Sequence, residues 1–195
     1  MKRTSSFRRT AAALATAGFV GSVAAQPAPT PYAVHMTGYE ETPLTLNSTG
    51  SGDFKAIVSA DGTSIQYMLT YRDLSSAATQ AHIHFGRPAI SGGIVLWLCA
   101  NNPPITPPAT IPTPQPCPAF PATIFGTLTA ADVVAVSGQG IDSGASGFAE
   151  MVNAFKTGSA YANVHTTVRP SGEIRGRIGP LPQGGNTAND KFHAG

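Results

Sequence analysis

Short runs in which apolar and polar residues alternate, separated by turn signals, constrain this chain more than any other feature. The runs occupy residues 32–38, 52–74, 80–86, 92–100, 161–168 and 172–179. Residues 60–63 (ADGT) divide the second run, and residues 169–172 (RPSG) separate the last two, as hairpin turns do. Because strand side chains point alternately to two faces, a period of two indicates strands with one face in the core. The pattern predicts a mainly β protein, an antiparallel β-sandwich.

Two segments late in the chain carry helical signals instead. Residues 128–134 (LTAADVV) begin with Thr129 in the position of an N-cap. Residues 146–158 end at Gly158 and place four apolar side chains on one helical face: Phe148, Met151, Val152 and Phe155. We therefore expect one or two short helices beside the strands.

A proline-rich segment, residues 99–121, interrupts the strand pattern. Nine of its 23 residues are proline, and a central strand is excluded because proline has no N–H for the ladder. We expect this segment to be a stiff loop. The only cysteines, Cys99 and Cys117, lie within it. In an exported protein such a pair predicts a disulfide at the base of the loop, and the alternative is that Cys99 binds a metal.

The N-terminus has the layout of an export signal. Basic residues at 2, 3, 8 and 9 precede a short apolar stretch, and Val23-Ala24-Ala25 matches a cleavage site. We expect residues 1–25 to be removed from a periplasmic or secreted protein, by either the general or the twin-arginine route. Residues 26–31 are expected to form a flexible lead-in, and residues 179–195 a disordered tail. No other stretch is long and apolar enough to span a membrane.

Charge argues against one class of partner. The whole chain has 12 basic and 10 acidic residues, and four of the basic residues belong to the predicted export signal. The remaining chain is therefore slightly acidic, with its few basic residues scattered. This composition excludes nucleic acid as an expected partner.

The segment 81–85 (AHIHF) contains two of the five histidines. Ala81, Ile83 and Phe85 form its apolar set, so alternation places His82 and His84 on the opposite face, about 7 Å apart between Cα atoms. Two imidazoles at this spacing are able to converge on one ion. We expect this face to point outward to solvent, and a surface without function is the alternative.

The last hairpin presents matching side chains. His165 and Asn163 share one face of the run 161–168, and Glu173 and Arg175 share one face of the following run. If these runs lie beside residues 80–86, His165 joins the other two histidines in a three-imidazole metal site. We expect Asn163 to orient a ring nitrogen, and Glu173 and Arg175 to edge the site without binding the ion. A surface ion pair of the last two is the alternative.

These segments together resemble the CHRD domain, which is named for its repeats in the extracellular protein chordin. The resemblance covers residues 32–178 and is carried by four motifs: MTGYEETP (36–43), DGTSIQYMLTYRDLSS (61–76), AHIHFGRP (81–88) with GGIVLWL (92–98), and YANVHTTVRPSGEIRGRI (161–178). The proline-rich segment 99–121 departs from the pattern and looks like an insertion. The resemblance implies an extracytoplasmic domain, but chordin's growth-factor binding does not transfer to a one-domain chain.

A weaker resemblance concerns AHIHFG (81–86) alone, which is similar to the copper-binding strand of copper/zinc superoxide dismutases. It implies an immunoglobulin-like or superoxide-dismutase-like sandwich in which NVHT (163–166) supplies the third copper ligand. The zinc loop of those enzymes has no counterpart in this chain, so the implied site is copper-only. Zinc remains an alternative ion, because neutral imidazoles suit both metals.

Three functions compete on this basis. The first is an exported binding module that holds or sequesters copper through His82, His84 and His165. The second is a copper-only, dismutase-like enzyme in which Arg175 steers an anion to the metal. The third is a metal-free extracellular domain that contacts another extracytoplasmic protein. We favour the binding module over the enzyme, with the metal ion as its principal partner.

Overall fold

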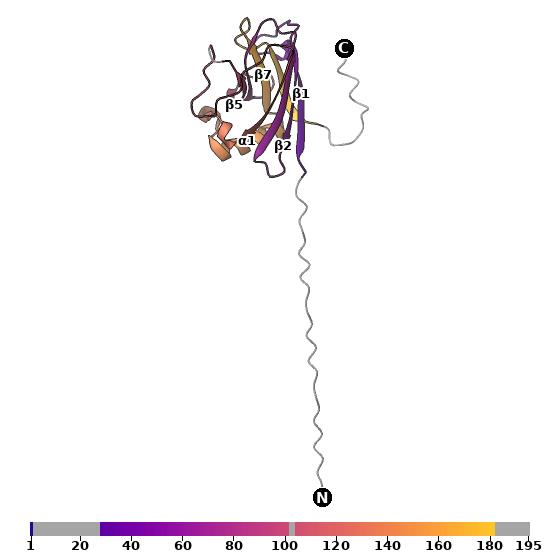
Figure 1. Cartoon of the computed structure of the whole chain (residues 1–195), viewed down its shortest axis with the longest axis vertical. Helices are drawn as coiled ribbons and strands as arrows, with labels where there is room; N and C mark the ends of the chain where they lie inside the picture. The colour runs from indigo at the N-terminus through magenta and orange to yellow at the C-terminus, as the bar shows by residue number, and fades with distance from the viewer. Residues whose placement is uncertain (2–27, 102–103, 182–195) are drawn as a thin grey trace.

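The computed structural model describes residue 1, residues 28–101 and residues 104–181 (Figure 1). Its strands are β1 (Thr30–Thr37), β2 (Ser51–Val58), β3 (Ser64–Arg72), β4 (Ala78–Phe85), β5 (Gly93–Ala100), β6 (Ala122–Thr129), β7 (Ala160–Thr166) and β8 (Ile174–Pro180). Its helices are α1 (Gly144–Thr157) and the 3-10 turns η1 (Gly38–Glu40), η2 (Ala130–Asp132) and η3 (Ser137–Gln139). The predicted export signal lies almost entirely outside the described residues, as does the tail from residue 182.

The strands form one antiparallel sheet in the order β5-β4-β7-β8-β1-β2-β3-β6. The sheet curls until its two ends approach each other, so that it is nearly closed into a barrel (Figure 1). Tyr67 of β3 donates its hydroxyl to the carbonyl of Leu98 in β5 at 2.9 Å, and Gln115 donates to the Tyr67 hydroxyl at 2.9 Å. The mainly β, antiparallel fold predicted from the alternation is therefore confirmed.

The inner face of the sheet carries the hydrophobic core, and α1 packs into it. Phe155 of α1 is fully buried, with its ring 5.4 Å from that of Tyr32 and 6.4 Å from that of Phe54. The four apolar residues expected on one face of this helix are all buried. Gly158 ends the helix in a left-handed conformation (φ 63°), which glycine adopts without the steric cost of a Cβ. Among the described residues, no helix has the length and apolar character of a membrane span.

Two local features differ from what the sequence predicted. The alternation did not reveal β6, in which Gly126 interrupts the pattern and Phe125 is exposed. The helix expected over residues 128–134 is only the 3-10 turn η2, although Thr129 does cap it by accepting from the Ala131 N–H. β1 begins at Thr30 and β8 ends at Pro180, two residues outside each end of the segment that carries the four motifs.

The proline-rich segment is fastened at both ends. Cys99 and Cys117 form a disulfide, with Cα atoms 5.0 Å apart and a sequence separation of 18. Asn101 reinforces this closure, since its side chain donates to the carbonyl of Cys117 and accepts from the N–H of the same residue. Closing a loop of this length is worth about 3 kcal/mol on the chain-entropy model. The disulfide excludes Cys99 as a metal ligand.

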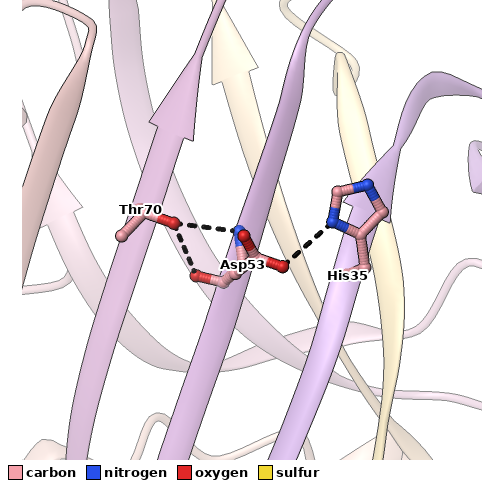
Figure 2. A network of polar contacts seen from close by, with 3 residues as sticks. All are labelled: His35, Asp53 and Thr70. Carbon is pink, nitrogen blue, oxygen red and sulfur yellow. Dashed lines mark hydrogen bonds and ion pairs between the residues drawn. The ribbon is translucent and has the colours of Figure 1, made fainter.

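Figure 2 shows a network of polar contacts that His35, Asp53 and Thr70 form across β1, β2 and β3. His35 on β1 lies 2.9 Å from the carboxylate of Asp53 on β2, and Thr70 on β3 accepts from the Asp53 N–H at 3.2 Å. The side chains of His35 and Asp53 are 55 % and 51 % exposed, so this ion pair contributes little to stability. His35 is thus a surface residue, which makes it a useful control for the other histidines.

Candidate metal centre

The register between β4 and β7 brings the other histidines together. His82 lies opposite Asn163, His84 lies opposite Tyr161, and Gln80 lies opposite His165. Directly paired residues point to the same face of a sheet. Ala81 and Ile83, between the histidines, point into the core. The cluster therefore lies on the face of β4 and β7 that is turned away from the core, as the alternation predicted.

The expectation that this face meets solvent is wrong. His82 is 0 % exposed, and His84 and His165 are each 7 % exposed. The covering comes from the loops that follow β1, β4 and β7, which fold back over the outer face and contact its side chains. A loop crossing over a strand leaves no mark on that strand's own alternation, and for this reason the sequence did not reveal the burial.

The imidazole nitrogens have spacings close to those of a metal site. Nδ1 of His82 lies 3.3 Å from Nε2 of His84. One nitrogen from each of His82, His84 and His165 lies within 4.8 Å of the other two. Because metal–imidazole bonds are about 2.0–2.1 Å long, two donors on one ion are at most about 4.2 Å apart. These spacings therefore place the three nitrogens near the distances that one ion requires.

Hydrogen bonds to carbonyl oxygens determine which nitrogens carry protons. Nδ1 of His84 lies 2.9 Å from the carbonyl oxygen of Gly92, and Nδ1 of His165 lies 3.0 Å from that of Pro170. A carbonyl oxygen only accepts, so both Nδ1 atoms are protonated and both Nε2 atoms have free lone pairs. Nε2 of His82 lies 3.0 Å from the side-chain amide of Gln80, so the single proton of neutral His82 is either on Nε2, facing Gln80, or on Nδ1, facing His84.

The consequence is that lone pairs outnumber donors among the nitrogens that face one another in the cluster. Nε2 of His84 lies 3.3 Å from Nδ1 of His82. This contact joins two lone pairs when Nε2 of His82 carries the proton, and it is a hydrogen bond when Nδ1 carries it. Nε2 of His165 is buried and has no hydrogen-bond partner in the part of the chain that the structure describes. Buried acceptors without donors are costly, and a cation between the three rings would satisfy all of them.

Burial keeps the three rings neutral, which is the form that binds metals. Desolvation lowers the pKa of His82 well below its ordinary value, and the neighbouring His165 and His84 lower it further. Desolvation likewise lowers the pKa of His84 to about 4, although the hydrogen bond to Gly92 opposes the shift. The pKa of His165 is also lowered by burial. All three imidazoles are therefore neutral at pH 7.

Two aromatic residues that the sequence interpretation did not single out pack against the histidines. Trp97 of β5 meets His82 edge to face, with ring centroids 4.5 Å apart. Tyr161 of β7 stacks on His84, also at 4.5 Å and with an angle of 7° between the ring planes. These rings restrict His82 and His84 to the orientations that bring their nitrogens together.

Arg175 lies behind this stack rather than in the cluster. Its guanidinium carbon is 3.5 Å from the centroid of the Tyr161 ring, a cation–π contact. The same guanidinium donates to the hydroxyl of Thr42 and to the carbonyls of Ile90 (2.7 Å) and Arg87 (3.3 Å). Arg175 thus links the sheet to the loops that cover the histidines.

Asn163 and Glu173 have roles other than those expected. Asn163 donates to the carboxylate of Glu41 at 2.6 Å and to the carbonyl of Ile174 at 3.0 Å, so its amide does not orient an imidazole in this structure. Glu173 is fully buried in a separate network, and none of the ion pairs among the described residues joins it to Arg175. Backbone carbonyls, which a sequence pattern does not distinguish, orient the rings of His84 and His165 instead.

Glu41 is a buried acid that the sequence interpretation missed, although it belongs to the motif at residues 36–43. It belongs to the loop that follows β1, and the residue is 7 % exposed. Burial raises the pKa of Glu41 to about 7, while the hydrogen bond from Asn163 and the charge of Arg175 act in the opposite direction. The carboxyl group is therefore only partly ionised at neutral pH.

Glu41→Gln is expected to increase the stability of the metal-free protein above pH 7. The folded-state pKa of Glu41 is about 7, above its ordinary value of 4.5. Its stabilising contribution is therefore complete below pH 4.5 and is lost as pH rises through 7, a change of about 3 kcal/mol over the whole range. Denaturant unfolding at pH 5 and pH 8 measures this change in the free energy of unfolding. Between pH 5 and pH 8 the Glu41→Gln variant should lose less stability than the wild type. The control Glu40→Gln, at an exposed neighbouring residue, should lose as much stability as the wild type.

Comparison with known protein families gives one match. The family model of the CHRD domain matches residues 32–178, which are the boundaries expected from the motifs and contain the whole histidine cluster. No curated protein and no solved structure gives a significant match to the chain.

Proposed function

This chain belongs to the CHRD family, and we propose that it is an exported binding module that holds one copper ion between His82, His84 and His165. The observation that carries the proposal is the convergence of one nitrogen from each of three buried, neutral imidazoles. A lone pair of histidines on a strand is a common surface feature. A third histidine from another strand, with carbonyl groups orienting two of the rings, is not needed for packing. An apolar residue would fill the same space without burying a polar ring.

The donor set supports copper. Neutral imidazoles suit copper and zinc, and among the divalent ions Cu(II) binds more tightly than Zn(II) in the Irving–Williams order. No carboxylate of a described residue belongs to the cluster, so the hard cations Ca²⁺ and Mg²⁺ lack the oxygen ligands that they require.

Two observations support binding over catalysis. A dismutase-like enzyme requires an open coordination position that an anion reaches from solvent, whereas these histidines lie beneath loops. The cation proposed to steer that anion, Arg175, is 4 % exposed and engaged by Tyr161 and by carbonyl groups. The disulfide supports export, because such bonds persist in oxidising compartments.

Copper titration of the metal-free protein tests the proposal. We expect one equivalent of copper to bind, with quenching of Trp97, the only tryptophan, whose ring contacts His82. Removing one of three ligands should weaken binding by more than the 10–100-fold typical of residues that only orient a ligand. His84→Ala and His165→Gln are therefore expected to weaken copper binding at least 100-fold.

The matched control is His35→Ala, which removes an exposed histidine outside the cluster. It should bind copper with wild-type affinity and stoichiometry. Circular dichroism in the near ultraviolet establishes that each variant is folded. Wild-type protein that binds no stoichiometric metal, or equal affinities for His84→Ala and His35→Ala, would contradict the proposed function.

A further inference from the structure

We propose that the three-histidine site is selective for the cuprous ion, Cu(I), over Cu(II) and Zn(II). This inference rests on the proposed function, because it specifies the charge of the ion that the same site holds. Three properties carry it: the donors are neutral, the site is buried, and a buried cation lies behind one of the ligands.

The donors do nothing to neutralise a bound ion. Among the described residues, the metal-compatible group consists of the three histidines, without an aspartate, glutamate or cysteine. The two buried carboxyl groups of this face are engaged elsewhere. Glu41 accepts from Asn163 at 2.6 Å, and Glu173 accepts from hydroxyl groups and a backbone N–H in its own network. A bound ion therefore keeps its full formal charge.

Burial penalises a doubly charged ion more than a singly charged one. His82 is 0 % exposed, and the other two ligands are 7 % exposed. The Born cost of moving an ion into a medium of low dielectric constant grows with the square of the charge of the ion. Relaxation of the protein reduces these costs but does not reverse their order. Cu(II) and Zn(II) therefore pay a larger desolvation penalty than Cu(I).

Arg175 adds to this discrimination. Its guanidinium is buried, lies 3.5 Å from the centroid of the Tyr161 ring, and carries a permanent positive charge. Tyr161 in turn stacks on His84, with ring centroids 4.5 Å apart. Repulsion between Arg175 and the bound ion is twice as large for a doubly charged ion as for a singly charged one.

Coordination number points the same way. Cu(II) prefers tetragonal sites with nitrogen and oxygen ligands, and Zn(II) is usually four-coordinate. This site offers three nitrogens, and the rings of Trp97 and Tyr161 pack beside His82 and His84. Zn(II) therefore needs a fourth ligand beyond the three imidazoles, and Cu(II) lacks its tetragonal donor set, whereas Cu(I), with its lower charge, is satisfied by three nitrogens.

Competition titrations of the wild-type protein test the selectivity. The metal-free protein is titrated with Cu(I) without oxygen against a cuprous chelator such as bicinchoninate, and with Cu(II) and Zn(II) against chromogenic chelators. We expect the Kd for Cu(I) to be at least 100-fold lower than those for the other two ions. For the Cu(II)/Cu(I) couple, a Kd for Cu(I) about 100-fold below that for Cu(II) corresponds to a midpoint potential raised by about 120 mV over that of the aqueous ion.

The outcomes separate this inference from the proposed function. A Kd for Cu(II) or Zn(II) equal to or below that for Cu(I) overturns the selectivity and leaves metal binding intact. Failure to bind any of the three ions contradicts the proposed function itself.

A matched pair of arginine variants isolates the charge term. Arg175→Gln should reduce the preference for Cu(I) over Cu(II) by about tenfold, because the more highly charged ion gains most from loss of a nearby cation. Arg177→Gln removes an exposed arginine of the same strand and should leave the preference unchanged. A folded Arg175→Gln protein with the wild-type preference would contradict the role assigned to Arg175.

Discussion

Glu173→Ala is expected to lower the free energy of unfolding by about 3–5 kcal/mol, the range for breaking a buried charged network. Glu173 is fully buried. Its carboxylate accepts from the hydroxyl of Ser48 (2.6 Å), from the N–H and hydroxyl of Ser75 (2.7 Å each) and from the hydroxyl of Thr166 (2.7 Å). These bonds join three segments that are far apart in the sequence. The substitution leaves all four donors without their acceptor.

The protonation state of Glu173 supports this expectation. Burial alone would raise the pKa of this carboxyl group, but the hydrogen bonds from Ser48, Ser75 and Thr166 outweigh it and lower the pKa. The group is therefore ionised at neutral pH, and hydrogen bonds to charged groups are each worth about 1.5–3 kcal/mol.

Urea denaturation at pH 7 measures the effect. Asp53→Ala, which removes a half-exposed carboxylate from a surface ion pair, serves as the control and should cost less than about 1 kcal/mol. Glu173→Gln should also destabilise, because its NH₂ group faces donors. If Glu173→Ala unfolds within 1 kcal/mol of the wild type, the network does not contribute as described.

Most of the predictions that the sequence allowed depend on the alternation of apolar and polar residues along the strands. The placement of His82 and His84 on the face opposite Ala81 and Ile83 depends only on the period of a strand, and the structure has that placement. The end of α1 at Gly158 and the capping of η2 by Thr129 were equally local signals. Such predictions succeed because each depends on residues within a few positions of one another.

What the sequence interpretation missed depends on contacts between distant segments. The histidines are buried because loops return over the sheet, and neither the loop path nor the carbonyls of Gly92 and Pro170 leave a pattern in the chain. Tyr161 shares the face of His165 but reads as an ordinary strand residue, and only the register with β4 stacks it on His84. These contacts convert a pair of strand histidines into a closed site.

Gly92→Ala is expected to destabilise the protein by about 4 kcal/mol, because the loop after β4 has no space for a side chain there. A Cβ at this position would lie 1.7 Å from the carbonyl oxygen of Phe85, a main-chain atom that moves only with its strand. The N–H of Gly92 donates to the hydroxyl of Tyr161 at 3.1 Å, and its carbonyl accepts from Nδ1 of His84 at 2.9 Å. A shift of the loop would break both bonds.

The same substitution should weaken copper binding by at least about 10-fold, the lower end of the range for residues that orient a ligand. Without the hydrogen bond to the Gly92 carbonyl, the His84 ring is free to rotate. Its proton is then free to move from Nδ1 to Nε2, the nitrogen that faces the cluster. Gly138→Ala is the matched control, because a Cβ there meets nothing within 4 Å, and it should change neither stability nor affinity. Thermal unfolding and copper titration of the two variants measure both effects. A Gly92→Ala protein with wild-type stability and copper affinity would show that the position of this loop does not determine the site.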